Sequence, residues 1–260
     1  MSRLSDNKKI VVVTAHPDDE SLWVGGILSS LSEMPNIDIN LICITGANHP
    51  FRRKELSDAM QKASISNWAI MDHVIPDKGG ILLNHPLTYY RKGLETLQIE
   101  EDDIDLLITH SPYGDEHEHI QHSQLFHELY RHCKDTEIPF SYFSFIPAPY
   151  YGKISILPHG KRGFGLHVIG LYKCFPRADI RISHAPPQYF VQFKVDKKNK
   201  NAMLRCYKSV DIEKHRGGYF AWTSFVEGLY LYNQRGLEAV ENIIKNLQSP
   251  IGDKNCFSRG

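Results

Sequence analysis

The chain has 260 residues, of which 42% are hydrophobic and 23% charged, and its 30 Lys and Arg residues balance its 30 Asp and Glu residues. This length suits one large domain with a sizeable core, and the balanced charge argues against a nucleic-acid-binding protein, which would usually carry a basic excess. Five scattered cysteines without a CxxC pair predict reduced thiols in a cytoplasmic protein, and no stretch approaches the roughly 20 apolar residues of a membrane span.

The first half of the chain alternates apolar runs with segments of helical periodicity. Residues 9–14 (KIVVVT) form a β-branched run typical of a buried strand, and residues 21–33, after the turn AHPDDE, have helical spacing. The alternation continues with predicted strands at 38–45, 68–74, 105–109 and 140–145 and predicted helices at 52–66, 87–97 and 120–133. This pattern predicts an α/β, Rossmann-like three-layer fold with a mostly parallel sheet and helices on both faces.

The second half of the chain is expected to extend the same sheet. Its patterns predict strands at 165–172 and 188–195, a helix at 197–208, and one or two helices within 218–247. We find no internal repeat, low-complexity segment or linker. Residues 1–260 are therefore expected to form a single domain, in which the part from about residue 150 adds strands and helices.

The AHPDDE turn gathers His16, Asp18, Asp19 and Glu20 at the end of the first predicted strand. Ligands bind at the carboxyl ends of strands in sheets of this kind. Three carboxylates beside an imidazole repel one another unless a cation or a proton neutralises them, and His and Asp are good zinc ligands. Acidic residues also favour a helix N-terminus, but that explanation does not account for His16. From this motif alone, both interpretations stay open.

A second polar cluster follows the predicted strand at 105–109. Its members lie within thirteen positions and are His110, Asp115, Glu116, His117, Glu118, His119 and His122. A catalytic zinc typically has three protein ligands and an open position for water. Two ligands from AHPDDE and one from this cluster would complete that set. Any single histidine here could instead cap a helix or lie in solvent, but the whole cluster opposite AHPDDE favours metal binding.

Three motifs together resemble the LmbE-like, or PIG-L, family of zinc-dependent N-acetylglucosaminyl de-N-acetylases. The first is AHPDDE, and the third is the acidic-His motif within THSPYGDEHEHIQ. The second is the TG–RxxEL element within ITGANHPFRRKELSDA, which is matched by Thr45, Gly46, Arg52, Glu55 and Leu56. Near the C-terminus, KKNKNAMLRCYKS resembles the family's helix before its final segment, so the resemblance spans roughly residues 9–210.

By position, the resemblance implies a zinc centre with an adjacent base. His16, Asp19 and His119 would hold the Zn2+, and Asp18 would be the general base. His119 fits the third ligand because the following residues continue into a helix as they do in the family. A weaker alternative makes His122 the metal ligand, through the sequence HIQH.

The chain departs from the family pattern beside the third ligand. The family usually has a histidine three residues before the ligand histidine, where it helps to stabilise the tetrahedral intermediate. Counted from His119, that position is Glu116, and His117 lies one residue closer. We predict His117 as the catalytic donor to the oxyanion, because an imidazole needs no shifted pKa to donate near neutral pH. His122, Tyr113 and Glu116 are the alternatives.

The implied reaction is the hydrolysis of an N-acetyl group on an amino sugar. Zinc lowers the pKa of its bound water toward 7, and Asp18 accepts the proton as this water attacks the amide. Arg52 and Glu118 are predicted to bind the substrate, a small molecule or a glycoconjugate, with Glu118 also orienting an imidazole. The competing readings are a zinc amidase for another N-acyl or thiol conjugate, a metal-dependent phosphoesterase and a non-catalytic sugar-binding homologue. The sequence leaves open whether the chain forms a homo-oligomer.

Overall fold

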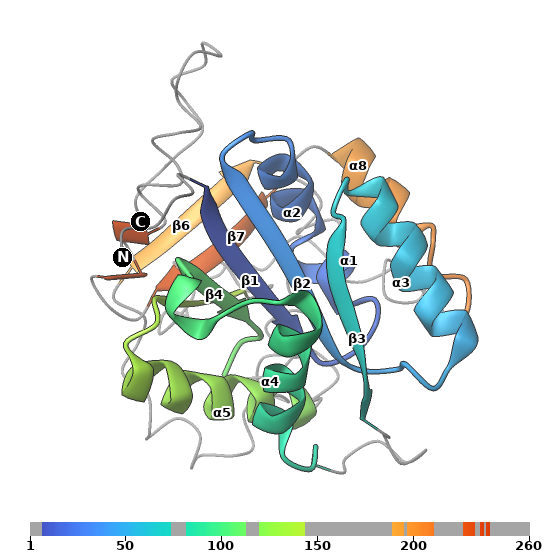
Figure 1. Ribbon diagram of the computed structural model, residues 1–260. Helices are drawn as coiled ribbons and strands as arrows, with labels where there is room; N and C mark the ends of the chain where they lie inside the picture. Colours follow the sequence, from blue (N-terminus) through green and yellow to red (C-terminus); the bar gives the residue numbers. More distant parts are fainter. Residues whose placement is uncertain are drawn as a thin grey trace, which may run out of the picture.

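A computed structural model describes residues 7–73, 82–112, 120–143, 189–194, 197–210, 226–231, 235–236 and 238–239. In this part of the chain, seven strands form one sheet in the order β3-β2-β1-β4-β5-β7-β6 (Figure 1). The strands are β1 (Lys8–Thr14), β2 (Ile37–Thr45), β3 (Asn67–His73), β4 (Leu106–Thr109), β5 (Phe140–Phe143), β6 (Tyr189–Lys194) and β7 (Val226–Leu231). The first five in the sheet order are parallel, whereas β7 pairs antiparallel with both β5 and β6.

Helices cover both faces of the parallel strands. The helices are α1 (Asp19–Trp23), α2 (Gly25–Ser32), α3 (Pro50–Lys62), α4 (Pro86–Leu97), α5 (Ile120–Thr136) and α8 (Lys197–Leu204), with a short 3-10 helix, η1 (Glu101–Asp103). One apolar core joins the sheet to α1, α2, α3 and α8, and a second joins it to α4 and α5 (Figure 1). The predicted three-layer α/β fold is therefore confirmed.

Strand β1 shows why these residues form a central strand. Its side chains alternate between the two cores, with Ile10 and Val12 in one and Val11 and Val13 in the other. All four are fully buried. A strand with helices on both faces needs apolar residues at every position, and β-branched residues fit the pleated backbone well.

The predicted helix at 21–33 is two helices in the structure. Val24, with φ −135° and ψ 11°, ends α1, and α2 begins at Gly25. A Cβ atom on Gly25 would lie 3.3 Å from Sδ of Met203, which belongs to α8. The glycine at the start of α2 thus lets α8, from far along the chain, pack closely, and local periodicity does not reveal this contact.

The second half of the chain confirms some expectations and corrects one. The predicted strand at 188–195 is β6, and the predicted helix at 197–208 is α8. The prediction of helices within 218–247 was wrong for Val226–Leu231, which form β7. This segment pairs with β5 and β6, so long-range pairing overrode its local pattern. The predicted strand at 165–172 lies outside the described residues, and the single domain stays a prediction.

The topology brings two loops to one edge of the sheet. Strands β1 and β4 are parallel neighbours, so the turn after Thr14 and the segment after Thr109 leave the sheet at the same edge. The polar cluster of AHPDDE therefore meets the start of α5. Across the described residues, none of the helices combines the length and apolar character that a membrane crossing requires.

Candidate metal centre

The turn that follows β1 is held from both neighbouring strands. The backbone N–H of Ala15 donates to Nε2 of His110, 3.0 Å away, in the segment after β4. The hydroxyl of Thr45, the last residue of β2, donates to the carbonyl oxygen of Ala15 at 2.7 Å. Both backbone polar groups of Ala15 are thus paired, and the direction of the chain into AHPDDE is fixed.

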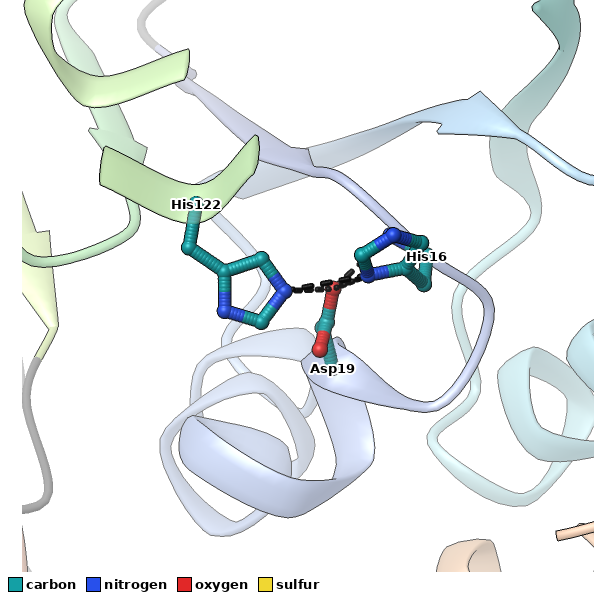
Figure 2. A group of neighbouring side chains, drawn as sticks. All are labelled: His16, Asp19 and His122. Atoms are coloured by element: carbon teal, nitrogen blue, oxygen red, sulfur yellow. Dashed lines mark hydrogen bonds and ion pairs between the residues drawn. The ribbon is translucent and has the colours of Figure 1, made fainter. Parts of the chain in front are cut away.

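Three donor atoms from this turn and from α5 converge on one point. Figure 2 shows the side chains of His16, Asp19 and His122, whose ligand atoms all lie within 4.8 Å of one another. Nδ1 of His16 lies 3.0 Å from Nε2 of His122 and 3.3 Å from Oδ2 of Asp19. Nε2 of His122 lies 3.2 Å from the same oxygen.

These separations fit a tetrahedral metal ion. Zinc binds His nitrogen and carboxylate oxygen at about 2.0–2.2 Å, so two ligand atoms of a tetrahedron lie about 3.3–3.6 Å apart. The three observed separations, 3.0–3.3 Å, form one slightly contracted face of such a tetrahedron. The donor set of two imidazoles and one carboxylate is also of the kind that catalytic zinc sites use.

A hydrogen bond to Gln121 orients the ring of His16. Nε2 of His16 lies 2.9 Å from Oε1 of Gln121, and an amide oxygen only accepts hydrogen bonds. The ring therefore carries its proton on Nε2 and presents the lone pair of Nδ1 toward Asp19 and His122. Such outer contacts fix the tautomer and the orientation of metal-binding histidines.

Asp19 is a buried carboxylate in its charged form. Oδ2 of Asp19 accepts the backbone N–H of His16 at 2.7 Å. Burial works to raise the pKa of Asp19, but the imidazole of His122 holds this pKa well below its ordinary value. A buried anion among imidazoles is the local charge that attracts a divalent cation.

His110 supports the cluster without being available as a ligand. Its ring stacks on that of His122, with centroids 3.9 Å apart and planes 18° apart. Burial, followed by the neighbouring His122, lowers the pKa of His110 to about 4, so this ring is neutral at pH 7. Its Nε2 lone pair already accepts the N–H of Ala15. No individual role was predicted for His110, although its position directly after β4 was a signal.

Asp18 adopts an unusual backbone conformation at the N-terminus of α1. Its φ of 126° is uncommon for a residue with a side chain and costs about 1–3 kcal/mol. Burial and the adjacent Asp19 raise the pKa of Asp18 well above its usual range, while Arg52 opposes this shift with Nη1 3.4 Å from Oδ2. Gly46, with φ 99°, packs so closely that a Cβ atom there would lie 2.7 Å from Cγ of Pro17.

The structure brings together some of the predicted site residues. His16, Asp18 and Asp19 lie in one turn, and Arg52 contacts that turn through the carbonyl oxygen of Pro17 at 2.9 Å. The third converging ligand is His122, the weaker of the two sequence alternatives. The predicted residues His117, Glu118 and His119, and the alternative Glu116, lie outside the described residues. Their roles stay predictions.

Comparison with known families finds a match within the first half of the chain. Residues 11–133 match the family model described as "PIG-L: GlcNAc-PI de-N-acetylase". The matched range contains AHPDDE, the RxxEL element and the start of α5. The predicted family resemblance is therefore confirmed. No curated protein matches the chain in sequence.

Several solved structures share the fold. A deacetylase of the teicoplanin biosynthesis pathway is 13% identical, with 86% of this chain and 97% of that chain covered and a TM-score of 0.51. N,N'-diacetylchitobiose deacetylase from Pyrococcus horikoshii is 17% identical, with 89% and 85% covered and a TM-score of 0.50. A conserved protein from Thermus thermophilus is 14% identical, with 85% and 93% covered and a TM-score of 0.51. At these identities the likeness shows the fold alone.

Proposed function

We propose that the chain, whose residues 11–133 match the PIG-L family model, is a zinc-dependent hydrolase that removes an N-acetyl group from an amino sugar or its conjugate. The observation that carries this proposal is the convergence of His16, Asp19 and His122 in the motif where the family implies its metal. Asp18 is buried and directly precedes Asp19 in the same turn, so we assign its carboxylate as the general base.

We assign His122, rather than His119, as the third zinc ligand. The support is geometric, because Nε2 of His122 lies within 3.0–3.2 Å of the other two ligand atoms. This assignment also removes the departure from the family pattern. Counted from His122, the residue three positions earlier is His119, so HIQH supplies the usual HxxH spacing. His119 then replaces His117 as the proposed donor to the oxyanion.

The proposed chemistry divides the work between the metal and the protein. Bound zinc would supply Lewis acidity and make water acidic enough to lose a proton near pH 7. Asp18 takes that proton as the water oxygen adds to the acetamide carbonyl carbon, and His119 donates a hydrogen bond to the carbonyl oxygen. The C–N bond then breaks and the nitrogen gains a proton, which leaves acetate and a free amine.

Arg52 is proposed to serve both the base and the substrate. Its guanidinium donates to the carbonyl oxygen of Pro17 and lies 3.4 Å from Asp18, which keeps the carboxylate oriented. A guanidinium has five N–H donors, and the Arg52 side chain is 27% exposed. Arg52 therefore retains N–H donors for a hydroxyl or anionic group of the substrate. Substrate binding is the role that the sequence predicted for Arg52, and Glu118 is proposed to share it.

Acetate release from a substrate panel tests the proposal. Zinc-loaded protein would be offered N-acetylglucosamine, its phosphates, N-acetylated disaccharides, an inositol conjugate and an N-acylated thiol conjugate. We expect acetate release from at least one amino sugar, its loss after chelation and its return when zinc is added. An Asp18→Asn variant with normal zinc content serves as the matched inactive control. Sugar binding without any acetate release would contradict the proposal and favour a sugar-binding protein.

A further inference from the structure

The peptide bond between Pro17 and Asp18 is held at both of its polar ends. Nη1 of Arg52 donates to the carbonyl oxygen of Pro17 at 2.9 Å. The N–H of Asp18 donates to Oε2 of Glu20 at 3.1 Å. Because the oxygen and the N–H of a trans peptide point in opposite directions, these two contacts together fix the plane of the peptide.

This plane controls where the Asp18 side chain points. The φ angle of Asp18 is the rotation about the bond that joins the nitrogen of this peptide to the Cα atom of Asp18. Its value of 126° lies in a sparsely populated region. A conformation of this kind persists only where the surroundings over-determine it. The hydrogen bonds from Arg52 and to Glu20 therefore hold Asp18 in this strained conformation.

Glu20 is in turn held by a residue from far along the chain. The hydroxyl of Tyr207 donates to Oε1 of Glu20 at 2.6 Å, and both side chains are buried. Oε1 also accepts the hydroxyl of Ser21, so each oxygen of Glu20 has a defined partner. A buried carboxylate with fixed partners on both oxygens has one preferred orientation.

The segment that carries Tyr207 is itself anchored to the RxxEL helix. Oε1 of Glu55 accepts the backbone N–H groups of Lys208 at 2.8 Å and of Ser209 at 2.7 Å. Glu55 lies on α3 together with Arg52, whose guanidinium holds the other end of the Pro17–Asp18 peptide. Helix α3 thus supports the Pro17–Asp18 peptide by two routes. Arg52 binds its carbonyl oxygen directly, and Glu55 anchors the segment of Tyr207, which contacts the Glu20 side chain that binds its N–H.

We infer that Tyr207 is a positioning residue for the reaction, whose hydroxyl orients Glu20 so that Glu20 holds the Pro17–Asp18 peptide and aims the Asp18 carboxylate. The inference rests on the proposed function, in which Asp18 is the general base. Tyr207 acts on the base and not on the metal, because its hydroxyl contacts none of the three converging ligands in the described residues.

Tyr207→Phe removes only the hydroxyl and isolates this effect. We expect kcat to fall roughly tenfold with KM within about twofold, because small misplacements of a reacting group slow the chemical step. Zinc content should stay at the wild-type value. The matched control is Tyr90→Phe, because Tyr90 is also fully buried but its hydroxyl has no hydrogen-bond partner among the described residues. Tyr90→Phe should leave kcat unchanged.

A double-mutant cycle separates positioning from a general loss of structure. If Tyr207 acts through Asp18, adding Tyr207→Phe to Asp18→Asn should not lower kcat further. A further fall of the same size in that background would overturn the inference. A rise in KM with unchanged kcat would also overturn it. Glu20→Gln gives a second variant for the same cycle should Tyr207→Phe not fold.

Hydrogen exchange of the Asp18 amide provides a readout that does not depend on turnover. In the intact protein this N–H is bound to Glu20, so we expect Tyr207→Phe to speed its exchange roughly tenfold by loosening the carboxylate. If wild-type protein hydrolyses nothing, the proposed function fails while this measurement still decides the contact chain. An unchanged exchange rate would overturn the role of Tyr207, and a faster rate would support it.

Discussion

Among the described residues, two clusters pair a buried histidine with a carboxylate, and they differ in how many groups converge. At the edge of the sheet, Oδ2 of Asp19 lies 3.2–3.4 Å from three imidazole nitrogens. Between η1 and α5, Nε2 of His132 lies 2.8 Å from Oε1 of Glu101. Both histidines at the centre of these clusters, His122 and His132, are largely buried.

The difference shows what distinguishes a candidate metal site from a histidine–carboxylate pair with a structural role. One histidine and one carboxylate satisfy each other, and Glu101 remains 29% exposed, so the second cluster needs nothing more. The first cluster directs several lone pairs at one point beside a strained, buried Asp18, which costs folding free energy. Such an arrangement is explained when a cation completes it, and four predictions test the comparison.

The largest effect is expected from removing a converging ligand. His122→Ala should lower zinc affinity by at least roughly 10³-fold, because about 10–16 kcal/mol of apparent zinc binding is shared among few ligands. Turnover should fall to the background rate. Zinc content after dialysis, measured by elemental analysis, and acetate release are the readouts.

Two histidine variants provide the controls for that result. His132→Ala removes the histidine of the second cluster and should keep about one equivalent of zinc, as expected for a single catalytic site. His119→Ala should also retain zinc, because the assignment gives it a role in turnover. Loss of zinc in His119→Ala with retention in His122→Ala would restore the sequence-based ligand assignment.

A smaller effect is expected from the residue beside the cluster. Asp18→Asn keeps the shape of the side chain but removes its basicity. Turnover should fall by roughly 10²–10⁴-fold, the usual contribution of general acid–base catalysis, while zinc content stays normal. Near-normal turnover in this variant would assign the base to another carboxylate.

The parallel strands and the polar turn of the first cluster could both be predicted from the sequence. The strands of the parallel sheet were predictable because KIVVVT and the similar runs that follow are apolar enough to be buried on both faces. The polar turn AHPDDE was recognisable because His16 beside three acidic residues is not explained by helix capping alone. Both patterns lie within short segments of sequence, so they can be recognised without knowledge of the fold.

The remaining features depend on contacts that no local pattern encodes. The convergence of His122 with His16 and Asp19 depends on the packing of α5 near the end of β1, which no local pattern encodes. Met203 of α8 packs closely on Gly25 at the start of α2, and β7 forms by pairing with β5 and β6. Tyr207 reaches Glu20 across 187 positions of sequence. Its role could therefore not be inferred from either motif alone.

The third prediction couples zinc to stability. A ligand that binds only the folded state stabilises it by about 2.7 kcal/mol when its free concentration is 100 times the dissociation constant. Zinc at that ratio should raise the urea midpoint of the wild-type protein and of His132→Ala equally. His122→Ala should show no such rise. A rise of equal size in His122→Ala would mean that zinc stabilises the protein from another site.

The smallest effect is expected from neutralising the second cluster. Glu101→Gln removes the negative charge but keeps an oxygen that can accept a hydrogen bond from Nε2 of His132. In the wild-type protein this nitrogen lies 2.8 Å from Oε1 of Glu101. Since the Glu101 side chain is 29% exposed, solvent screens the pair, and the free energy of unfolding should fall by no more than about 1 kcal/mol. Urea unfolding with zinc present measures this change, and zinc content and kcat should match the wild type. A loss of zinc or of turnover in Glu101→Gln would show that the second cluster is coupled to the first, and the distinction between a structural pair and a converging site would then not hold.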